Sequence, residues 1–432
     1  MTRLAWRVEP RDAPGSGERA LAFRPDDGAF ELYNDYLEGV AVLRPGPFGP
    51  APRSARSADG TRPLAPEASI DGYGTFTFPY GPISMGVPEA GRFDLRTYGE
   101  RILAVSPVGG FKARHIAEGA LGLTVEDAAL RVERTAGSVS ASHVAAFLAA
   151  GEAAEGRGVP TPELFVRVLA QELQRIYNHL RLIARIAEAA SQNVGLAQTH
   201  ALGEEVLRLQ ASIFGHRWLF GALLPGGPAR HLDARDRRAA ASRLDRIASE
   251  FDALWELFLE SRTFIDRIQS TGPLSRADVV RGGAVGPTLR ASGVGWDDRL
   301  RVPTLPYLDL FVALPNESAG DALARVLVRG AEIRASRLIL EQLFDRWPAE
   351  GGPPEPPAAP LAPGRGLARV EAPSGDLVYD VTIADHRIRA LGVRTPSQAN
   401  WPVFAASLRD AVFTDFHFDF ESFGLLFAET DG

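Results

Sequence analysis

The sequence predicts an α+β fold in which a bundle of long helices carries small antiparallel β-sheets. Apolar residues recur at helical spacing in four long segments between residues 161 and 347, as is typical of helices that share one core. Residues that alternate between apolar and polar on both sides of these segments are typical of short strands. The 432 residues contain no internal repeat at a fixed period. Together these patterns predict one helical body with small sheets beside it.

Composition limits the chemistry that this chain can carry by itself. Hydrophobic residues make up 45% and charged residues 23%, as in ordinary globular proteins, and the net charge of −7 gives no reason to expect nucleic-acid binding. The chain has no cysteine, which excludes disulfides, cysteine-ligated iron–sulfur clusters, thiolate zinc sites and cysteine nucleophiles. Its first residues carry charges throughout and no run of about 20 apolar residues occurs, so we expect neither a secretory signal nor a membrane span.

The start of the chain, residues 1–67, is weakly patterned and is predicted to be an N-terminal arm or a small domain. Residues 68–432 are predicted to form the main domain. It opens with alternating segments at Thr75–Phe78, Phe93–Thr97 and Arg101–Val105, which are typical of antiparallel strands. These strands are expected to pack as a small sheet on the helices.

The helical core, predicted for residues 111–348, contains one especially clear helix. Thr161 is a favourable N-cap and Pro162 suits the first helical position. An apolar stripe follows at spacings of three and four: Leu169, Leu173, Ile176, Leu180 and Ile183. This pattern predicts a helix of roughly 26 residues. Three further long helices are predicted at about 202–223, 237–269 and 322–347.

Residues 349–366 are rich in proline and glycine and are predicted to be a long loop. C-terminal strands are predicted beyond it, within residues 367–432. They cover segments 368–370, 377–383 and 388–393, followed by a buried final strand with alternating phenylalanines at positions 413, 416, 418, 420 and 423. Five acidic residues near the end admit two interpretations, a ligand cluster or, as favoured here, a solvated tail: Asp415, Asp419, Glu421, Glu429 and Asp431.

No catalytic motif stands out from the residues alone. The eight histidines form no HExxH pair, and there is no Walker A loop, no GxGxxG turn after a strand and no GxSxG elbow. Glu172, Arg175 and His179 share one face of the clearest helix, where Glu172 can pair with Arg175. A structural ion pair with a hydrogen-bonded histidine is the favoured interpretation of this helix motif.

Several strings, in their order and spacing, resemble the large subunits of energy-converting nickel–iron hydrogenases and the homologous large quinone-site subunit of complex I. The resemblance runs from Tyr73 to the C-terminus. Its strings are Phe78–Gly86 with a Gly-Pro turn, Gln171–Leu180, Pro225–Gly227, Gly286–Gly293, Val370–Gly375 and Arg394–Asn400. It implies a fold like that of the nickel–iron hydrogenase large subunit, a long-helix bundle with small antiparallel sheets.

The hydrogenase members of this family hold nickel and iron with four thiolates, two near the start of the chain and two near its end. The matching positions here are Ala136, Val139, Leu426 and Glu429, while the histidine that follows the first pair remains as His143. Alanine, valine and leucine cannot coordinate a metal. The resemblance therefore implies a member without a nickel–iron centre or another metal, for which hydrogen activation is not expected.

Complex I also lacks these cysteines, and its cavity binds quinone with a histidine after the Gly-Pro turn and a tyrosine after the former cysteine pair. Ser84 and Phe147 stand at those positions here, so the resemblance implies that the usual quinone pair is missing. His143 is the catalytic candidate, as a substitute proton donor near the cavity, and His115 is a second candidate. A structural role is favoured for both histidines.

The resemblance implies a subunit of a membrane-bound redox complex. The expected partners are an iron–sulfur small subunit that brings the cluster, other peripheral-arm subunits, and membrane subunits that hold the chain at the cytoplasmic face. The chain itself is expected to bind no cofactor, unless quinone or another acceptor enters the former active-site cavity. A non-catalytic scaffold or coupling subunit is the alternative, and an independent soluble protein is a third. An open polar cavity would favour the redox role, and one filled by Val139, Phe147 and Leu426 the scaffold role.

Overall fold

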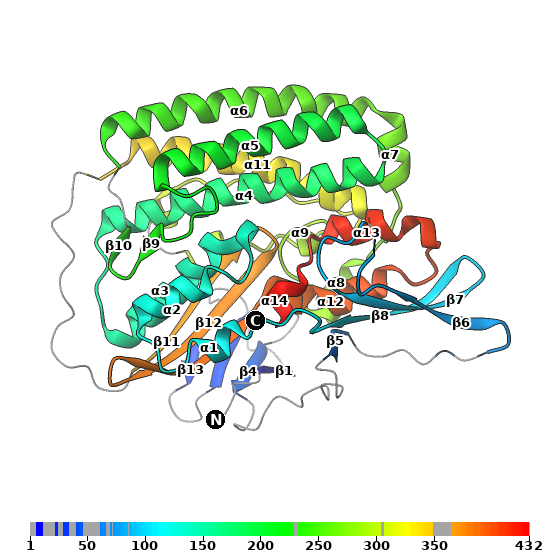
Figure 1. Cartoon of the computed structure of the whole chain (residues 1–432), viewed down its shortest axis with the longest axis horizontal. Helices are drawn as coiled ribbons and strands as arrows, with labels where there is room; N and C mark the ends of the chain where they lie inside the picture. The colour runs from blue at the N-terminus through cyan, green and yellow to red at the C-terminus, as the bar shows by residue number, and fades with distance from the viewer. Residues whose placement is uncertain are drawn as a thin grey trace.

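The structure is a computed structural model of the whole chain. It describes the backbone of residues 6–11, 22–24, 29–33, 40–45, 61–65, 70, 72–84, 86–228, 232–303, 306–348 and 364–431, and side chains within these ranges from 61 to 430. In this part of the chain, the long helices lie above small antiparallel sheets (Figure 1). The predicted α+β class with a long-helix bundle is confirmed.

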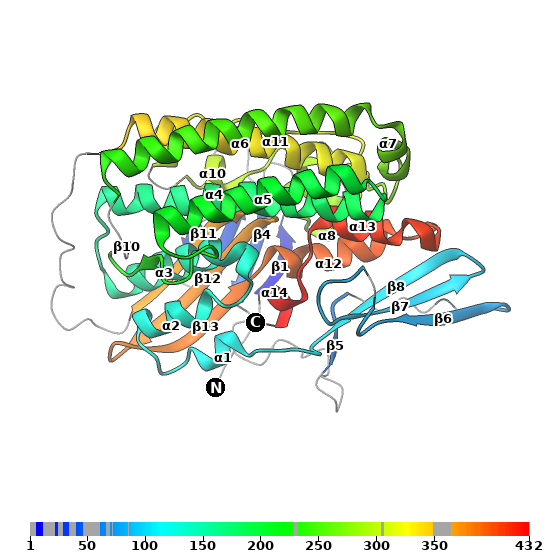
Figure 2. The same cartoon turned by 45° about the horizontal axis from the view of Figure 1, so that its top comes forward.

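Four long helices form the bundle in Figures 1 and 2. They are α4 (Thr161–Ala189), α5 (Asn193–Phe214), α6 (Ala234–Glu260) and α11 (Ala322–Asp345). Helix α4 packs against α5, α11 and the short C-terminal helix α13 (Phe416–Phe423). All five members of its predicted apolar stripe are buried. Its N-cap is Pro160, so the predicted cap at Thr161 is wrong by one residue.

Several predicted helix boundaries in the bundle are wrong. Helix α5 begins at Asn193, before the predicted start near 202, and it ends at Phe214, before the predicted end near 223, because Gly215 takes a left-handed conformation with φ of 82°. A short hairpin, β9 (Leu223–Leu224) and β10 (Gly227–Pro228), follows. The helix predicted for 237–269 is two helices, α6 and α7 (Arg262–Ile268), because Ser261 between them is extended.

Shorter helices surround the bundle. They are α1 (Ile116–Gly119), α2 (Val125–Val132), η1 (Gly137–Val139), α3 (Ser140–Glu155), α8 (Arg276–Gly282), α9 (Gly286–Arg290), α10 (Asp298–Arg301) and η2 (Tyr307–Asp309). No helix in the described ranges is long and apolar enough to cross a membrane.

Two antiparallel sheets precede the helices. The first has the order β1 (Trp6–Arg11), β4 (Val40–Pro45), β3 (Ala29–Tyr33), β2 (Ala22–Arg24). The second has the order β5 (Arg62–Pro63), β8 (Arg101–Gly109), β7 (Arg92–Tyr98), β6 (Thr75–Tyr80), so the three strands predicted there are confirmed. The domain boundary near residue 67 stays a prediction.

The third sheet consists of β11 (Gly364–Ala372), β12 (Gly375–Ala384) and β13 (Arg387–Arg394), so the three strands predicted here are confirmed. Strand β11 begins within the predicted loop 349–366, and the rest of that loop, residues 349–363, lies outside the described residues. Helices α2 and α3 lie over it in both views (Figures 1 and 2). Helix α3 approaches β11 closely at two glycines. A Cβ at Gly364 would lie 1.8 Å from the carbonyl oxygen of Ala154, and one at Gly366 would lie 2.0 Å from that of Ala150. Only glycine allows this backbone contact.

The end of the chain is helical, and the predicted final strand is wrong. The elements are α12 (Pro396–Ser407), η3 (Phe413–Asp415), α13 (Phe416–Phe423) and α14 (Phe427–Asp431). Residues 416, 420 and 423 are spaced for one helix face, and these phenylalanines pack with Phe93 and Phe404. Burial of Phe418 as well gave the alternating pattern that the sequence shared with a strand.

The predicted solvated acidic tail is also wrong. Asp419, Glu421 and Glu429 are 5% exposed or less. Asp419 pairs with Arg325 at 2.5 Å, and Glu421 pairs with Arg185 at 2.9 Å. Asp415 is half-buried, and the side chain of Asp431 lies outside the described residues. These carboxylates are therefore part of the interior of the protein.

Candidate functional site

The four positions that the resemblance assigned to metal ligands lie close together, and one of them, Glu429, belongs to the last helix α14, which Figures 1 and 2 show near the middle of the molecule. Ala136, Val139 and Leu426 form one buried apolar cluster, with Ala428 packed against it. Glu429, one turn on in α14, is 1% exposed. The positions are therefore neighbours in space, but three of them carry hydrocarbon side chains.

His143 lies at the edge of this cluster in the first turns of α3 and is fully buried. Its Nδ1 lies 2.8 Å from the hydroxyl of Tyr379, and its Nε2 lies 3.3 Å from a carboxylate oxygen of Glu429. The other carboxylate oxygen of Glu429 accepts hydrogen bonds from the hydroxyl and the backbone N–H of Ser397, at the N-terminus of α12. A carboxylate is favourable at that end of a helix. Both polar members of the site are thus fully bonded within the protein.

Tyr379 was not identified from the sequence, although the alternation of β12 places it inward with Leu377 and Val381. Its ring makes edge contacts with both His143 and Phe147, at centroid distances of 5.9 and 6.0 Å. Burial raises the pKa of its phenol far above the usual range, so the hydroxyl keeps its proton. The structure therefore places a tyrosine hydroxyl beside the phenylalanine at position 147.

The remaining candidates of the cavity lie elsewhere. His115 begins α1 with φ of 51°, is partly exposed, and pairs with Glu118 at 2.9 Å. Ser84 lies in the turn after β6, and its buried hydroxyl has no hydrogen-bond partner among the described residues. The same segment contributes Glu89, which accepts a hydrogen bond of 2.5 Å from the backbone N–H of Phe427 at the start of α14. That loop thus reaches the site through Glu89, and neither Ser84 nor His115 bonds to His143.

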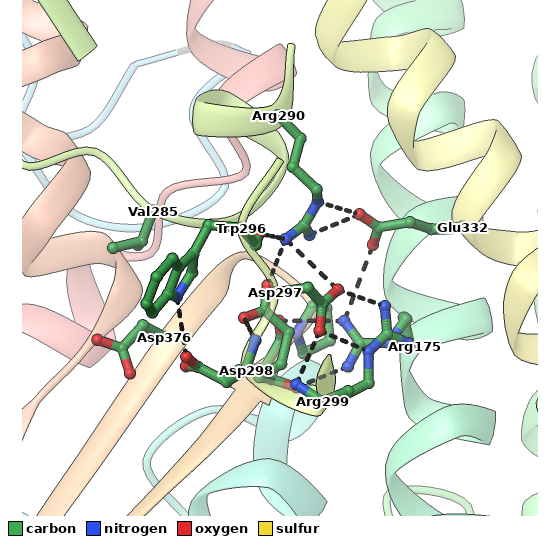
Figure 3. Close-up of polar contacts among 12 residues, drawn as sticks. Arg175, Val285, Arg290, Trp296, Asp297, Asp298, Arg299, Glu332 and Asp376 are labelled. Atoms are coloured by element: carbon green, nitrogen blue, oxygen red, sulfur yellow. Dashed lines mark hydrogen bonds and ion pairs between the residues drawn. The ribbon is translucent and has the colours of Figure 1, made fainter. Parts of the chain in front are cut away.

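The helix motif of α4 belongs to a second group of buried polar residues, shown in part in Figure 3. Glu172 lies 3.3 Å from Arg175 and 3.2 Å from Arg299, and it accepts hydrogen bonds from the hydroxyls of Ser336 and Tyr307 at 2.6 Å. Burial raises the pKa of Glu172, but the two guanidinium groups outweigh it and hold the pKa below its usual value. This carboxylate is therefore ionised.

His179 lies in the same group, two turns along α4. Its Nε2 is 2.8 Å from Glu332 and its Nδ1 is 3.3 Å from Arg329, so Nε2 donates and Nδ1 accepts. Burial lowers the pKa of His179 to about 4. The ring is therefore neutral at neutral pH.

Arg290 joins this motif to the sheet. It donates to Glu332 at 2.6 Å and to Glu371 at 2.8 Å, and it lies 3.5 Å from Asp297 (Figure 3). Sequence reasoning missed these partners because they come from α9, α10, α11 and β11, far apart along the chain. The described residues include no group of three or more His, Asp or Glu arranged to hold a metal ion.

Comparisons with known proteins identify the family of this chain. The family model for the 49 kDa subunit of respiratory-chain NADH dehydrogenase matches residues 196–358. An NADH-quinone oxidoreductase subunit of Roseiflexus sp. is 30% identical over 317 residues, which cover 70% of this chain and 84% of that protein. The chain belongs to the 49 kDa subunit family.

Other relatives of this 49 kDa family chain are named as a hydrogenase and as part of a sulfane sulfur reductase. The carbon monoxide-induced hydrogenase of Rhodospirillum rubrum is 28% identical over 345 residues, covering 79% of this chain and 95% of that protein. A chain from the structure of the membrane-bound sulfane sulfur reductase, an archaeal respiratory membrane complex, has a TM-score of 0.78 at 25% identity, covering 84% of this chain and all of that one. The relatives are thus subunits of complex-I-like and membrane-bound hydrogenase complexes.

The residues present do not fit a nickel–iron centre. Ala136, Val139 and Leu426 offer no donor atom, and the donor oxygens of Glu429 are bonded to His143 and Ser397. His143 and Tyr379, two groups of this site able to donate a hydrogen bond to a carbonyl oxygen, are buried and bonded to each other.

Proposed function

We propose that this 49 kDa family chain is a subunit of a membrane-bound respiratory complex related to complex I and to membrane-bound hydrogenases, where it serves as a scaffold or coupling subunit without a nickel–iron centre. The filled site carries the proposal. Ala136, Val139 and Leu426, at positions that the resemblance assigns to metal ligands, form a packed apolar cluster, and Glu429 is hydrogen-bonded to His143 and Ser397. A subunit kept for assembly needs the framework around this site but not its chemistry.

In this role, an iron–sulfur small subunit, other peripheral-arm subunits and membrane subunits are the partners, and they hold the chain at the cytoplasmic face of the membrane. The iron–sulfur cluster belongs to the small subunit, since this chain has no cysteine to ligate one. Support comes from the relatives, whose names place them in respiratory and hydrogenase complexes.

A second candidate function is reduction of quinone or another acceptor at the altered site. The observation that favours it is the hydrogen bond of 2.8 Å between His143 and Tyr379, because both groups can give a proton to an acceptor. Binding would require the side chain of Leu426 or Val139 to move and expose this pair.

The first experiment purifies the native membrane complex through a tag on this chain and measures its metals and its reduction of quinones. The His143→Ala and Tyr379→Phe variants are compared with wild type, with the exposed His200→Ala as control. The scaffold role predicts no stoichiometric nickel, equal reduction in all variants and loss of the complex when the chain is deleted. Reduction that falls only in the His143 and Tyr379 variants supports the second function. Nickel at one atom per chain contradicts both.

A second experiment tests whether the four positions once formed a ligand set. The variant with Ala136→Cys, Val139→Cys, Leu426→Cys and Glu429→Cys is titrated with Co²⁺, whose thiolate bands report the coordination. Four converging cysteines should bind one metal tetrahedrally. The variant that retains Leu426 is the matched control and should bind more weakly. Absence of binding above the cysteine-free wild type would refute the assignment of these positions.

A further inference from the structure

The charged group between α4 and the third sheet contains more carboxylates than guanidinium groups in direct contact with them. In the described part of the chain, six buried carboxylates belong to it: Glu172, Asp297, Asp298, Glu332, Glu371 and Asp376. Five guanidinium groups contact them: Arg175, Arg290, Arg299, Arg369 and Arg394. A sixth, Arg329, makes no direct ion pair with them among the described residues, although the charge of Glu332 acts on it. Among the groups in direct contact, two carboxylates therefore share one guanidinium group, that of Arg369.

The imbalance falls on Asp298 and Asp376. The Nε of Arg369 donates to both, at 3.0 and 2.6 Å, so one oxygen of each aspartate lies close to the same N–H group. Two carboxyl groups held this close favour a state in which one of them carries a proton, because like charges repel. Arg394 makes a further contact of 3.0 Å to Asp376 alone. The proton is therefore expected on Asp298.

The pKa values agree with this distribution. Burial raises the pKa of Asp298 well above its usual value, and the charge of Asp376 adds to the effect. At Asp376 burial is outweighed by Arg369 and Arg394, which hold its pKa down. Glu371, the residue directly opposite Asp376 in the sheet, also has its pKa raised to about 7, by burial and by the charge of Asp297.

A small cavity connects these groups with the surface. It has a volume of about 20 Å³, enough for one water molecule, and Asp298 and Glu371 both line it. Val302 and Val370, at its other side, are partly exposed. The rest of the lining is polar and is contributed by Gln171, Arg299, Tyr307 and Arg369. A single water could therefore carry a proton between solvent and the carboxyl groups.

We propose that Asp298 and Asp376 form a buried proton-binding site, which exchanges its proton with solvent through the water-sized cavity beside Glu371. The reaction is a simple transfer: hydronium or a buffer acid gives a proton to a carboxylate oxygen, an O–H bond forms, and the charge of the group rises by one. The guanidinium groups keep their protons throughout. This site lies apart from the filled cluster around Leu426 and does not depend on the function proposed above.

The test is infrared spectroscopy of the full chain, purified with its native partners and labelled with ¹³C-carboxyl aspartate. At pH 8 wild type should show a protonated aspartate C=O band that the Asp298→Asn variant lacks. Asp419 does not interfere, because its pKa is raised only to about 6. The matched control is Asp380→Asn. Asp380 is buried in β12, like Asp376, but it pairs with Arg365 at 2.7 Å. Its band should be that of wild type.

Even if a variant fails to fold, the wild-type spectrum alone tests whether a buried aspartate carries a proton at pH 8. No protonated aspartate band at pH 8, or a band that persists in folded Asp298→Asn, overturns the proposal. The route is tested by transfer to D₂O, which should shift the wild-type band at once. Val302→Phe should block the cavity and slow this shift at least tenfold. An equal rate in wild type and Val302→Phe would refute the cavity as the route.

Discussion

The two faces of the third sheet have opposite character, although they share the same strands. Side chains alternate along β12, so Tyr379 points toward α3 while Asp376 points to the other side. On the α3 side, Tyr379, His143 and Glu429 are the polar residues of an apolar neighbourhood that holds Leu426. On the other side, charged residues fill the interior. The comparison teaches that the site named by the resemblance consists mainly of hydrocarbon side chains, while the buried charges gather in a region for which only a structural ion pair was predicted.

The largest expected effect comes from breaking the charged side. Arg290→Met removes the partner of Glu332 and Glu371, leaving buried carboxylates unpaired, and should lower the free energy of unfolding by about 3–5 kcal/mol. Arg208→Met, which breaks an exposed pair with Glu204, should cost about 1 kcal/mol or less. Urea unfolding of both variants measures the difference. Equal losses would mean that the charged side contributes no more than a surface ion pair.

The next effect concerns the filled side. Leu426→Ala opens a void against Ala136 and Val139 and should cost about 2–5 kcal/mol. Leu338→Ala is the control, because Leu338 is 40% exposed and should cost less than about 1 kcal/mol. Thermal unfolding compares the two. A Leu426 variant as stable as the control would show that the former ligand positions are not packed.

A smaller loss is expected from the hydrogen bond that joins α3 to the sheet. Tyr379→Phe keeps the ring contacts but leaves Nδ1 of His143 without its partner, at a cost of about 1–3 kcal/mol. Tyr177→Phe, on a half-buried ring, serves as control. If both variants unfold alike, the bond between Tyr379 and His143 does not stabilise the fold.

The last expected effect, which is small within any one pH unit, is a dependence on pH. Because the pKa of Glu371 is about 7 in the folded chain and near 4.5 when unfolded, the folded state holds the extra proton between these values. Stability from this group is complete below pH 4.5 and is lost as pH rises to 7, on the order of 1 kcal/mol per pH unit. Wild type should show this slope relative to Glu371→Gln in urea unfolding at several pH values. His179, with a lowered pKa, acts in the opposite sense and cancels in the difference. Parallel curves for the two proteins would contradict the raised pKa.

Local patterns were enough to predict much of the fold. The apolar stripe of α4 and the alternation of β7, β8 and β12 each reflect one buried face. Burial of one face sets the spacing of apolar residues that are close in sequence, so a short segment is enough to predict it. The helix α13 was missed because its phenylalanines are buried on more than one side. The apolar residues therefore do not recur only at the spacing of three and four that predicts a helix.

The sites needed information that neighbouring residues do not contain. The spacing of Glu172 and Arg175 indicated an ion pair. Glu332, which binds His179, lies on another helix, and the residues around His179 in the sequence do not predict that contact. The burial of Asp419 likewise depends on Arg325, a distant residue. Tyr379 looked like one more inward residue of a strand until α3 placed His143 beside it.

The contact between His143 and Glu429 also has a kinetic consequence. The two residues are 286 positions apart in the sequence, so this side of the sheet closes only after most of the main domain has been synthesised. Contacts of such long sequence separation slow folding, because a large loop must be ordered before they form. Until then Ala136 and Val139 remain uncovered by Leu426. During much of its synthesis the nascent chain therefore exposes apolar side chains that are buried in the folded protein. A chaperone would reduce aggregation most effectively at this stage.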